Sequence, residues 1–181
     1  FNEFVSYAKA NPGKLNYGSA VPVVRVLIEA ITRAHGLNVV YIPYTAYAAL
    51  QQALIAGKDI QVSFVAEANV DAMADKFRVL AVTGERRLPS FPNIPTFKEL
   101  GFEKIKGISY SLNVRAGTPK AAMDRLYAAA SRTLQEPEVK AQLAKVRLEV
   151  VNEGPEAALK TLNDAAKFYG DVAQQIGLKP Q

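Results

Sequence analysis

The sequence contains no cysteine and, in 181 residues, a single histidine. Without cysteine the chain has no disulfide, no thiolate metal ligand and no cysteine nucleophile, and one histidine leaves little for acid–base or metal chemistry. The motifs G-x-x-x-x-G-K-[ST], G-x-G-x-x-G and G-x-S-x-G, which bind phosphates or present a nucleophile, are also missing. These absences predict a protein that is not an enzyme, with no catalytic residue, no metal site and no cofactor.

Long runs of one charge and long apolar runs are missing as well. The 22 basic and 17 acidic residues give a net charge of +5, but the longest basic run is the pair Arg86-Arg87. Because no aromatic residues interleave with a basic stripe, we expect no nucleic-acid partner. A mild positive field suits anionic small molecules and also serves solubility alone. No window approaches the ~18 consecutive apolar residues of a membrane span.

Short β-branched runs alternate with helical patterns through the first half of the chain, which is typical of βαβ units. The predicted strands are residues 15–18, 38–42, 60–64 and 77–82, and the predicted helices are residues 22–35, 46–56 and 66–76. We therefore expect an α/β fold with one mainly parallel, four-stranded sheet. The side chains expected in its core are Leu27, Ile31, Val40, Leu54, Val62 and Leu80.

The second half is predicted to be mostly helical after a proline-rich connector. Residues 88–95 contain three prolines and mark a boundary, and a short helix is expected from Thr96 to Gly101. Residues 108–114 alternate in the manner of a strand. Proline near a helix start then predicts three helices, which begin at Thr118-Pro119, Pro137 and Gly154-Pro155.

Several motifs that contain proline, glycine or charged residues occur in order along the chain. They are YAKANPGKLNY at residues 7–17, IPY at 42–44, AVT at 81–83 and AGTP at 116–119, with Arg87, Pro92, Pro95-Thr96, Glu99 and Gly101 between the last two. In these motifs and their spacing the whole chain resembles the Bug proteins, the extracytoplasmic solute-binding receptors of tripartite tricarboxylate transporters.

The resemblance implies a two-lobed fold like that of type II periplasmic binding proteins. Residues 1–102 would form the second, ligand-binding lobe, which is α/β and contains the parallel sheet. Residues 103–181 would form the return segment of the first lobe, with one strand and mostly helices. That lobe is expected to be incomplete, because a typical member has a further portion upstream of Phe1. Its uncovered apolar faces predict a homodimer, or an exchanged C-terminal element, that buries Leu159, Leu162 and Ile176.

For function, the resemblance implies a periplasmic receptor that holds a small organic acid between its lobes. The solute would be a di- or tricarboxylate or an amino acid, the partners would be the membrane permease subunits, and no cofactor is implied. An alternative stays open, in which a truncated or degenerate relative acts as an interaction or assembly module without binding solute. The loop after Gly18 supports it, since SAVPVVR stands where the family usually has a glycine- and serine-rich loop and a histidine.

Ligands of open α/β sheets bind outside the carboxyl ends of strands, where helix N-termini favour carboxylates. The ligand-binding residues predicted at three such ends are Tyr17, Gly18, Ser19, Ala20, Val21, Tyr44, Thr45, Ala46 and Phe64. For Ser19 two interpretations stay open: a hydroxyl for the ligand, or a cap for the helix that Pro22 begins. Thr45 and Ala46 replace the lysine and glycine that the family usually has.

Two further polar residues are interpreted as structural. The guanidinium of Arg25 matches a carboxylate bidentately, but its spacing to Glu29 and Arg33 predicts a solvated stripe along the helix. His35 precedes Gly36 at the predicted end of the same helix, where an imidazolium and a glycine suit a C-cap. Neither residue is therefore included in the predicted site.

Overall fold

The structure, a computed structural model, describes residues 1–70, 75–107 and 109–178. By its internal contacts the chain divides into two units, Phe1–Gly107 with Ala166–Gln181, and Ile108–Ala165. The division falls close to the boundary predicted after residue 102, but the C-terminal end of the chain groups with the first unit. The assignment of the two parts to two lobes of a receptor stays a prediction.

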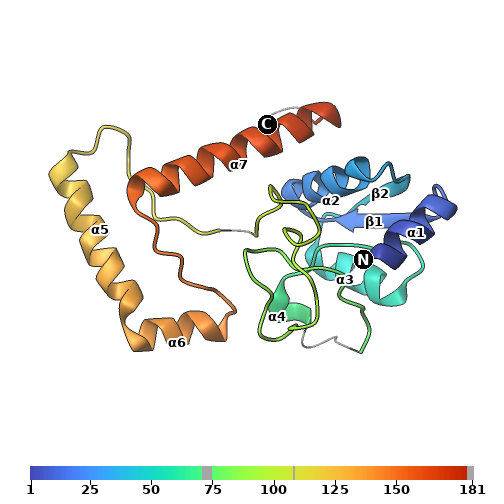
Figure 1. The fold of residues 1–181 in the computed structure, drawn as a ribbon, viewed down its shortest axis with the longest axis horizontal. Coiled ribbons are helices and arrows are strands. Elements are labelled where there is room, and N and C mark those ends of the chain that lie inside the picture. The colour runs from blue at the N-terminus through green and yellow to red at the C-terminus, as the bar shows by residue number, and fades with distance from the viewer. Residues whose placement is uncertain (71–74, 108, 179–181) are drawn as a thin grey trace. The chain divides into compact units, whose positions relative to one another are not determined.

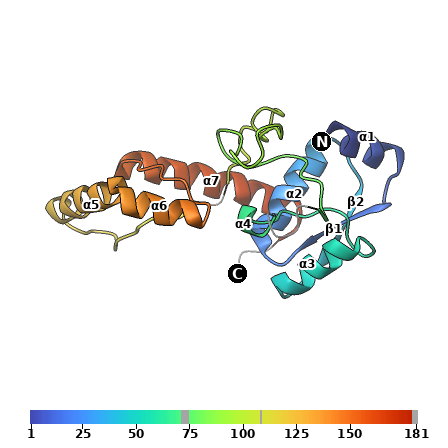
Figure 2. The ribbon, with the colours of Figure 1, turned by 90° about the horizontal axis from the view of Figure 1, so that it is seen from below.

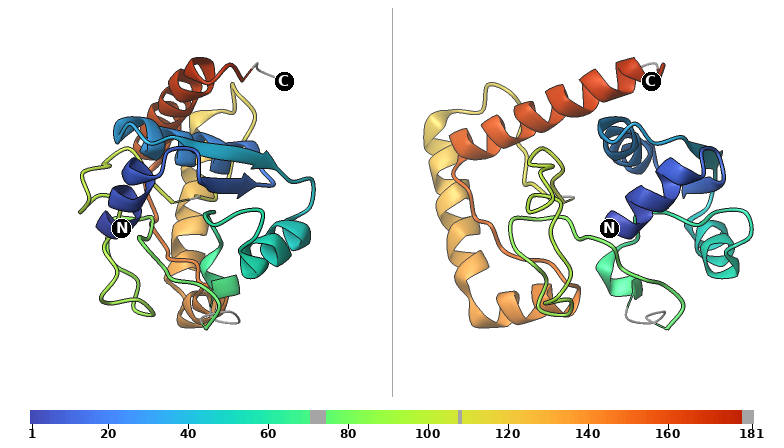
Figure 3. Two further views of the ribbon diagram at one scale, coloured as in Figure 1. Left: turned by 90° about the vertical axis from the view of Figure 1, so that its right-hand side faces the viewer. Right: turned by 45° about the vertical axis from the view of Figure 1, so that its right-hand side comes forward.

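The first unit is built around two parallel strands. Its elements are α1 (Asn2–Ala10), β1 (Leu15–Ser19), α2 (Pro22–Ala34), β2 (Val39–Pro43), α3 (Tyr47–Ala56) and α4 (Glu67–Val70). β1 and β2 pair with Leu15 opposite Val39 and Ser19 opposite Pro43, and α2 is the crossover that parallel strands require. α2 and α3 lie on opposite sides of β1 (Figures 1 and 3). The predicted α/β fold is confirmed, and the carboxyl ends of both strands lie together.

α2 has buried residues from its first turn to its last. Pro22 begins the helix at a position where its missing N–H is not needed. His35 is the C-cap, and Gly36 follows with a φ of +63°, so the predicted C-cap is confirmed. The buried residues of α2 are Val24, Val26, Leu27, Ile28, Ile31 and Thr32. Burial stabilises each large apolar side chain by about 1.5–3 kcal/mol, so the helix start is firmly held.

The prediction of a four-stranded sheet is wrong, because the sheet has two strands. Residues 60–64 do run beside β1, but only Tyr17 and Val62 form a bridge. The Asn16 carbonyl accepts hydrogen bonds from the N–H groups of both Gln61 (2.9 Å) and Val62 (3.2 Å). Two successive donors on one acceptor form a bulge, which interrupts a regular ladder.

Residues 77–82, the fourth predicted strand, pair with a different segment. The Val82 N–H donates to the Pro95 carbonyl (3.0 Å), and the Phe97 N–H donates to the Val82 carbonyl (2.9 Å). The predicted helix from Thr96 to Gly101 forms hydrogen-bonded turns instead. The side chains of Thr96 and Glu99 each accept the other's backbone N–H, at 3.0 and 2.7 Å, which is a capping box without a helix behind it.

The core of the first unit lies on both faces of α2. One buried cluster contains Leu27, Ile31, Phe97 and Ile105, and a second contains Tyr17, Val24 and Ile28. Of the predicted core residues, Leu27 and Ile31 are buried, whereas Leu54, Val62 and Leu80 are half-buried. Val40 is 41% exposed, so its predicted burial is wrong.

The second unit is helical among the residues that the structure describes. Its elements are α5 (Lys120–Gln135), α6 (Pro137–Lys145) and the first part of α7 (Pro155–Gln175), as Figure 2 shows. The three predicted helix starts are confirmed. The strand predicted at 108–114 is wrong for residues 109–114, which form no strand, while residue 108 lies outside the described residues. A strand needs a partner for its N–H and C=O groups, and none pairs with this segment.

The predicted helix at 66–76 is seen only in part, as α4. Residues 71–74 lie outside the described residues, and residues 75–76 form a turn, so the prediction is wrong at that end. No helix in the described ranges combines the length and the apolar character needed to cross a membrane.

Candidate functional site

A small cavity lies where the two parallel strands end. Its volume is about 200 Å³. The residues that line it are Ser19, Ala20, Val21, Pro22, Arg25, Tyr41, Tyr44 and Leu178. It is formed by the end of β1, the loop into α2, the first turn of that helix, and the end of β2. This is the position at which parallel α/β sheets bind ligands.

Four of the predicted site residues meet at this cavity: Ser19, Ala20, Val21 and Tyr44. Thr45 and Ala46 follow directly in the chain and are exposed, but they are not part of the lining. The loops after β1 and β2 therefore lie side by side, as the sequence predicted. Their role in binding stays a prediction.

The other three predicted residues lie in the interior. Tyr17 is 0% exposed, and Phe64 stacks on Phe97 with ring centroids 5.4 Å apart. A Cβ at Gly18 would lie 2.5 Å from Leu50 Cδ1 and 2.6 Å from Ile60 Cδ1. The glycine thus allows two side chains to pack against β1, which differs from the expected close approach of a ligand.

The Ser19 side chain is used within its own loop. Its hydroxyl donates to the Val21 carbonyl and accepts the Val21 N–H at 3.1 Å, and the residue is 1% exposed. The N-cap of α2 is Val21, with no side-chain cap. Ser19 is therefore not the helix cap, and its hydroxyl proton is already donated. Its contribution is to fix the path of the backbone from β1 into α2.

Arg25 enters the cavity, which the sequence did not predict. Its Cζ lies 4.4 Å from the centroid of the Tyr41 ring, a cation–π contact. Its Nε is buried and has no hydrogen-bond partner. The prediction of a solvated stripe holds for Arg33, whose side chain is 51% exposed, but it is wrong for Arg25 and for Glu29, whose side chain is 18% exposed. The spacing of 25, 29 and 33 could not reveal this, because Tyr41 becomes a neighbour only through the parallel register of β1 and β2.

The charges around the cavity are unbalanced. Glu29 accepts the Tyr17 hydroxyl at 2.6 Å and pairs with Arg33, so its carboxylate is engaged away from the cavity. Burial, together with the Glu29 carboxylate, raises the pKa of Tyr17, and the nearby Arg25 opposes this. Among the described residues, the ion pairs do not include Arg25, and the cavity lining contains no carboxylate. The charge that lines the cavity in the described part of the chain is therefore positive.

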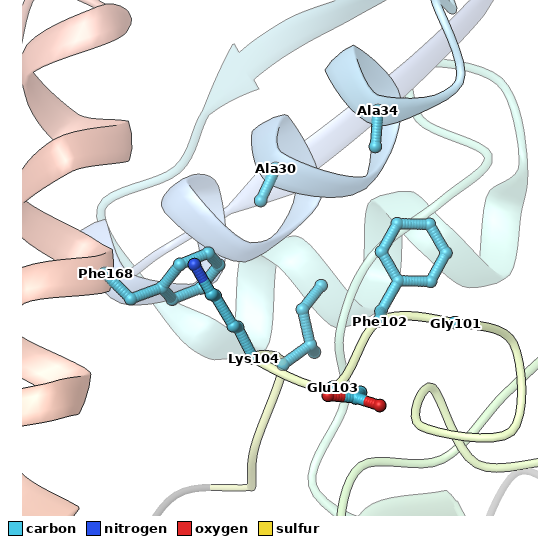
Figure 4. Close-up of a pocket in the computed structure, with 8 residues that line it drawn as sticks. Ala30, Ala34, Gly101, Phe102, Glu103, Lys104 and Phe168 are labelled. Atoms are coloured by element: carbon cyan, nitrogen blue, oxygen red, sulfur yellow. The ribbon is translucent and has the colours of Figure 1, made fainter.

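A second cavity, of about 340 Å³, lies beside α2 and is shown in Figure 4. Its lining residues are Ala30, Ala34, Gly101, Phe102, Glu103, Lys104, Ile105 and Phe168. The walls are mostly apolar, and the only charged residues are the neighbours Glu103 and Lys104. Within the described ranges, no group of histidine and acidic residues could hold a metal ion. The cavity at the strand ends is therefore the better candidate for binding a small anion.

Comparison with known sequences identifies relatives over nearly the whole chain. Residues 1–178 match the family described as "Tripartite tricarboxylate transporter family receptor". A UPF0065 protein of Bordetella pertussis is 32% identical over 99% of the chain and 57% of its own length. A UPF0065 protein of Cupriavidus necator is 28% identical over 97% of the chain and 54% of its own length. The chain thus spans about half the length of the curated relatives it matches.

Solved structures show the same fold. A periplasmic transporter is 25% identical, with a TM-score of 0.74 over 99% of this chain and 61% of its own. A Rhodopseudomonas palustris protein solved with adipate is 22% identical, with a TM-score of 0.74 over 99% and 62%. MatC of the same species, with bound malate, is 21% identical, with a TM-score of 0.61 over 95% and 61%. The fold is therefore that of part of a periplasmic binding protein.

Proposed function

Because this chain belongs to the tripartite tricarboxylate transporter family of receptors, we propose that it is part of an extracytoplasmic receptor that binds small carboxylates. The observation that carries the proposal is the cavity at the carboxyl ends of β1 and β2, whose lining includes Arg25 and no acidic residue. The proteins of similar fold that were solved with adipate and malate support a carboxylate as the class of ligand.

The first turn of α2 gives this wall a second attraction for an anion. The first N–H groups of a helix have no partner within the helix, and the helix dipole places partial positive charge there. Pro22 has no N–H, so Val23 and Val24 supply these donors. A carboxylate near such a terminus gains about 0.3–1 kcal/mol, which is weak alone and stronger beside a guanidinium. No cofactor takes part in this chemistry.

The proposal extends to the transport system and to the compartment. The family description implies that the loaded receptor presents its solute to membrane permease subunits of a tripartite transporter, in the periplasm. A di- or tricarboxylate or an amino acid is the expected cargo. The receptor function would need both lobes, since the cavity described here is one wall, smaller than the ~300–1,000 Å³ of ordinary ligand sites.

A second candidate function is an interaction module that no longer binds solute. It is favoured by the loop after Gly18, in which Ser19 and Val21 bond each other and Pro22 cannot donate. This candidate predicts that carboxylates leave the cavity residues unaffected, which makes the two functions distinguishable.

Titration followed by two-dimensional NMR tests the proposal on this chain. Succinate, malate, citrate and aspartate are added to millimolar levels, with sodium chloride at equal ionic strength as the control. We expect saturable shifts of the amide signals of Ala20, Val21 and Tyr44. Shifts that equal those caused by chloride, or that map to another surface, would contradict solute binding at this site and favour the interaction module.

A further inference from the structure

We infer that Arg25 is the specificity-determining residue of the site, and that its guanidinium binds a carboxylate of the solute directly. Tyr41 is the positioning residue that holds this guanidinium in place. The inference rests on the proposed function and goes further, because it assigns recognition to a side chain that lies outside the predicted ligand loops. It also names the chemistry required of the solute, a planar anion that can accept two parallel hydrogen bonds.

The first step of the argument is an inventory of hydrogen-bond donors at the cavity. The Ser19 hydroxyl donates to the Val21 carbonyl, and the Val21 N–H donates back to that hydroxyl. Pro22 has no N–H. Ala20, Tyr41 and Tyr44 also line the cavity and can supply neutral donors, but Arg25 is the charged donor in the lining, and charged donors bind a carboxylate more strongly.

The second step concerns the free-energy cost of burying the Arg25 Nε without a hydrogen bond. Its Nε is buried without a partner, and a buried donor without a hydrogen bond loses its hydration without compensation. Arg33, two turns further along the same helix, shows the contrast. Its Nε donates to Glu29 at 3.3 Å, and its side chain is 51% exposed. Arg25 is half-buried and lies near the Tyr17 hydroxyl, but its Nε donor is left over at the edge of the cavity, where a carboxylate could accept from it.

The third step concerns orientation. The Tyr41 ring lies 4.4 Å from Arg25 Cζ, and the same ring contacts Tyr17 with centroids 5.1 Å apart. Tyr17 in turn is fixed by its hydrogen bond to Glu29. The Arg25 guanidinium therefore packs on a ring that is itself fixed by its neighbours. It loses little conformational entropy when it binds a ligand, and such preorganisation improves affinity. Arg25 is thus both charged and positioned.

Three variants of the chain test the inference, with succinate as the probe and NMR titration as the readout. Arg25→Gln removes the charge, Arg25→Lys keeps the charge but loses the fork, and Arg33→Gln is the control, with the same charge loss on the same helix. We expect succinate affinity to fall at least about tenfold in Arg25→Gln and several-fold in Arg25→Lys. Arg33→Gln should change it less than about twofold. Tyr41→Leu should give an intermediate loss.

A second measurement on the unaltered chain does not depend on how the variants fold. Phenylglyoxal modifies arginine, and peptide mass spectrometry reports its adducts at Arg25 and Arg33 separately. Succinate should slow the modification of Arg25 several-fold and leave that of Arg33 unchanged.

The outcomes separate this inference from the proposed function. Retained affinity in Arg25→Gln with no protection of Arg25 would overturn the inference and leave the receptor function standing. Equal losses of succinate affinity in Arg25→Gln and Arg33→Gln would mean that Arg25 acts only through its charge at a distance. That result would also overturn the inference. Failure of the unaltered chain to show saturable binding would overturn the inference, and failure of a receptor of the relatives' full length as well would overturn the proposed function.

Discussion

The Tyr17 hydroxyl donates a 2.6 Å hydrogen bond to Oε1 of Glu29, and this contact joins the first strand to the helix that follows it. Tyr17 is 0% exposed, and the side chain of Glu29 is 18% exposed. Glu29 also accepts from Arg33 at 3.3 Å, so its carboxylate joins a buried hydroxyl to an exposed guanidinium. Arg25 lines the cavity at the strand ends, and Glu29 does not.

The first prediction is that Tyr17→Phe destabilises the fold by about 1–2 kcal/mol, because it removes one partner of a part-buried hydrogen bond to a charged group. Unfolding in urea, followed by circular dichroism, measures the change. Tyr7→Phe is the matched control, since Tyr7 is 53% exposed and its substitution should cost less than about 0.5 kcal/mol. Equal effects of the two substitutions would contradict the structural role of the Tyr17 hydroxyl.

The same hydroxyl predicts a dependence of stability on alkaline pH. Burial and Glu29 raise the pKa of Tyr17 above its ordinary value of 10.0, so the folded state favours the neutral phenol. Because this pKa is higher in the folded state, the Tyr17 phenol contributes its full stabilisation of the fold at pH values below the unfolded-state pKa. That stabilisation is lost as the pH rises past about 10 toward the folded-state pKa. The stability difference between the unaltered chain and Tyr17→Phe should therefore shrink above pH 10, whereas a constant difference would count against the assignment.

Gly18 supports a second stability prediction. An alanine Cβ there would lie 2.5 Å from Leu50 Cδ1 and 2.6 Å from Ile60 Cδ1, and this overpacking should cost about 1–3 kcal/mol. Gly170→Ala in α7 is the control, because nothing lies within 4 Å of its Cβ position. Alanine is the better helix former, so this control should gain up to about 1 kcal/mol. The prediction fails if the urea midpoints of the two variants shift in the same direction.

The sequence predicted the elements of the first unit well because their signals are local. Pro22, Gly36 and the apolar face of α2 determine one helix, and each β-branched run marks an extended segment. The number of strands in the sheet could not be predicted in this way. It depends on a bulge, at which Asn16 accepts from both Gln61 and Val62, and on the pairing of Val82 with residues 95–97, and neither leaves a mark in the apolar pattern.

The site was predicted in its location and only partly in its chemistry. The rule that ligands bind beyond strand ends brought Ser19 and Tyr44 to one cavity. Whether Arg25 points to solvent or to a ligand depends on the ring opposite it in the next strand, and Tyr41 is 16 residues away in sequence. The fate of the Ser19 hydroxyl likewise depends on the turn it closes, which residue type alone does not fix.

A fourth prediction concerns self-association through the second unit. Leu112 is 77% exposed, Leu159 is 59% exposed and Leu162 is 39% exposed, whereas Ile176 is half-buried within the first unit. Because exposed apolar groups of this kind mark interfaces, we expect a homodimer in sedimentation velocity at high concentration. Leu159→Glu should weaken it, and Ile55→Glu, at a site that is 42% exposed in α3, should not. A strict monomer at every concentration would contradict the expected dimer.

The last prediction is that this chain alone binds dicarboxylates weakly, with a Kd in the millimolar range, whereas a receptor extended upstream to the length of its relatives binds them far more tightly. A Kd of 1 mM corresponds to about −4 kcal/mol, which one guanidinium and a helix terminus can supply. Reaching micromolar affinity requires about 4 kcal/mol more, and in a two-lobed receptor this comes from donors on the opposite wall and from closure that removes water.

Calorimetric titration of both forms with malate, succinate, citrate and aspartate measures the difference, with the affinity of the extended form expected to be higher by a factor of about a thousand. Micromolar binding by this chain alone would show that its loop supplies more donors than the Ser19 turn allows. Ser19→Ala and Thr45→Ala would then identify which loop does so, because the first would free the Val21 N–H and the second would remove an exposed hydroxyl beside the cavity. Equal, weak binding by both forms would instead favour the interaction module, since the second wall would then add nothing to recognition.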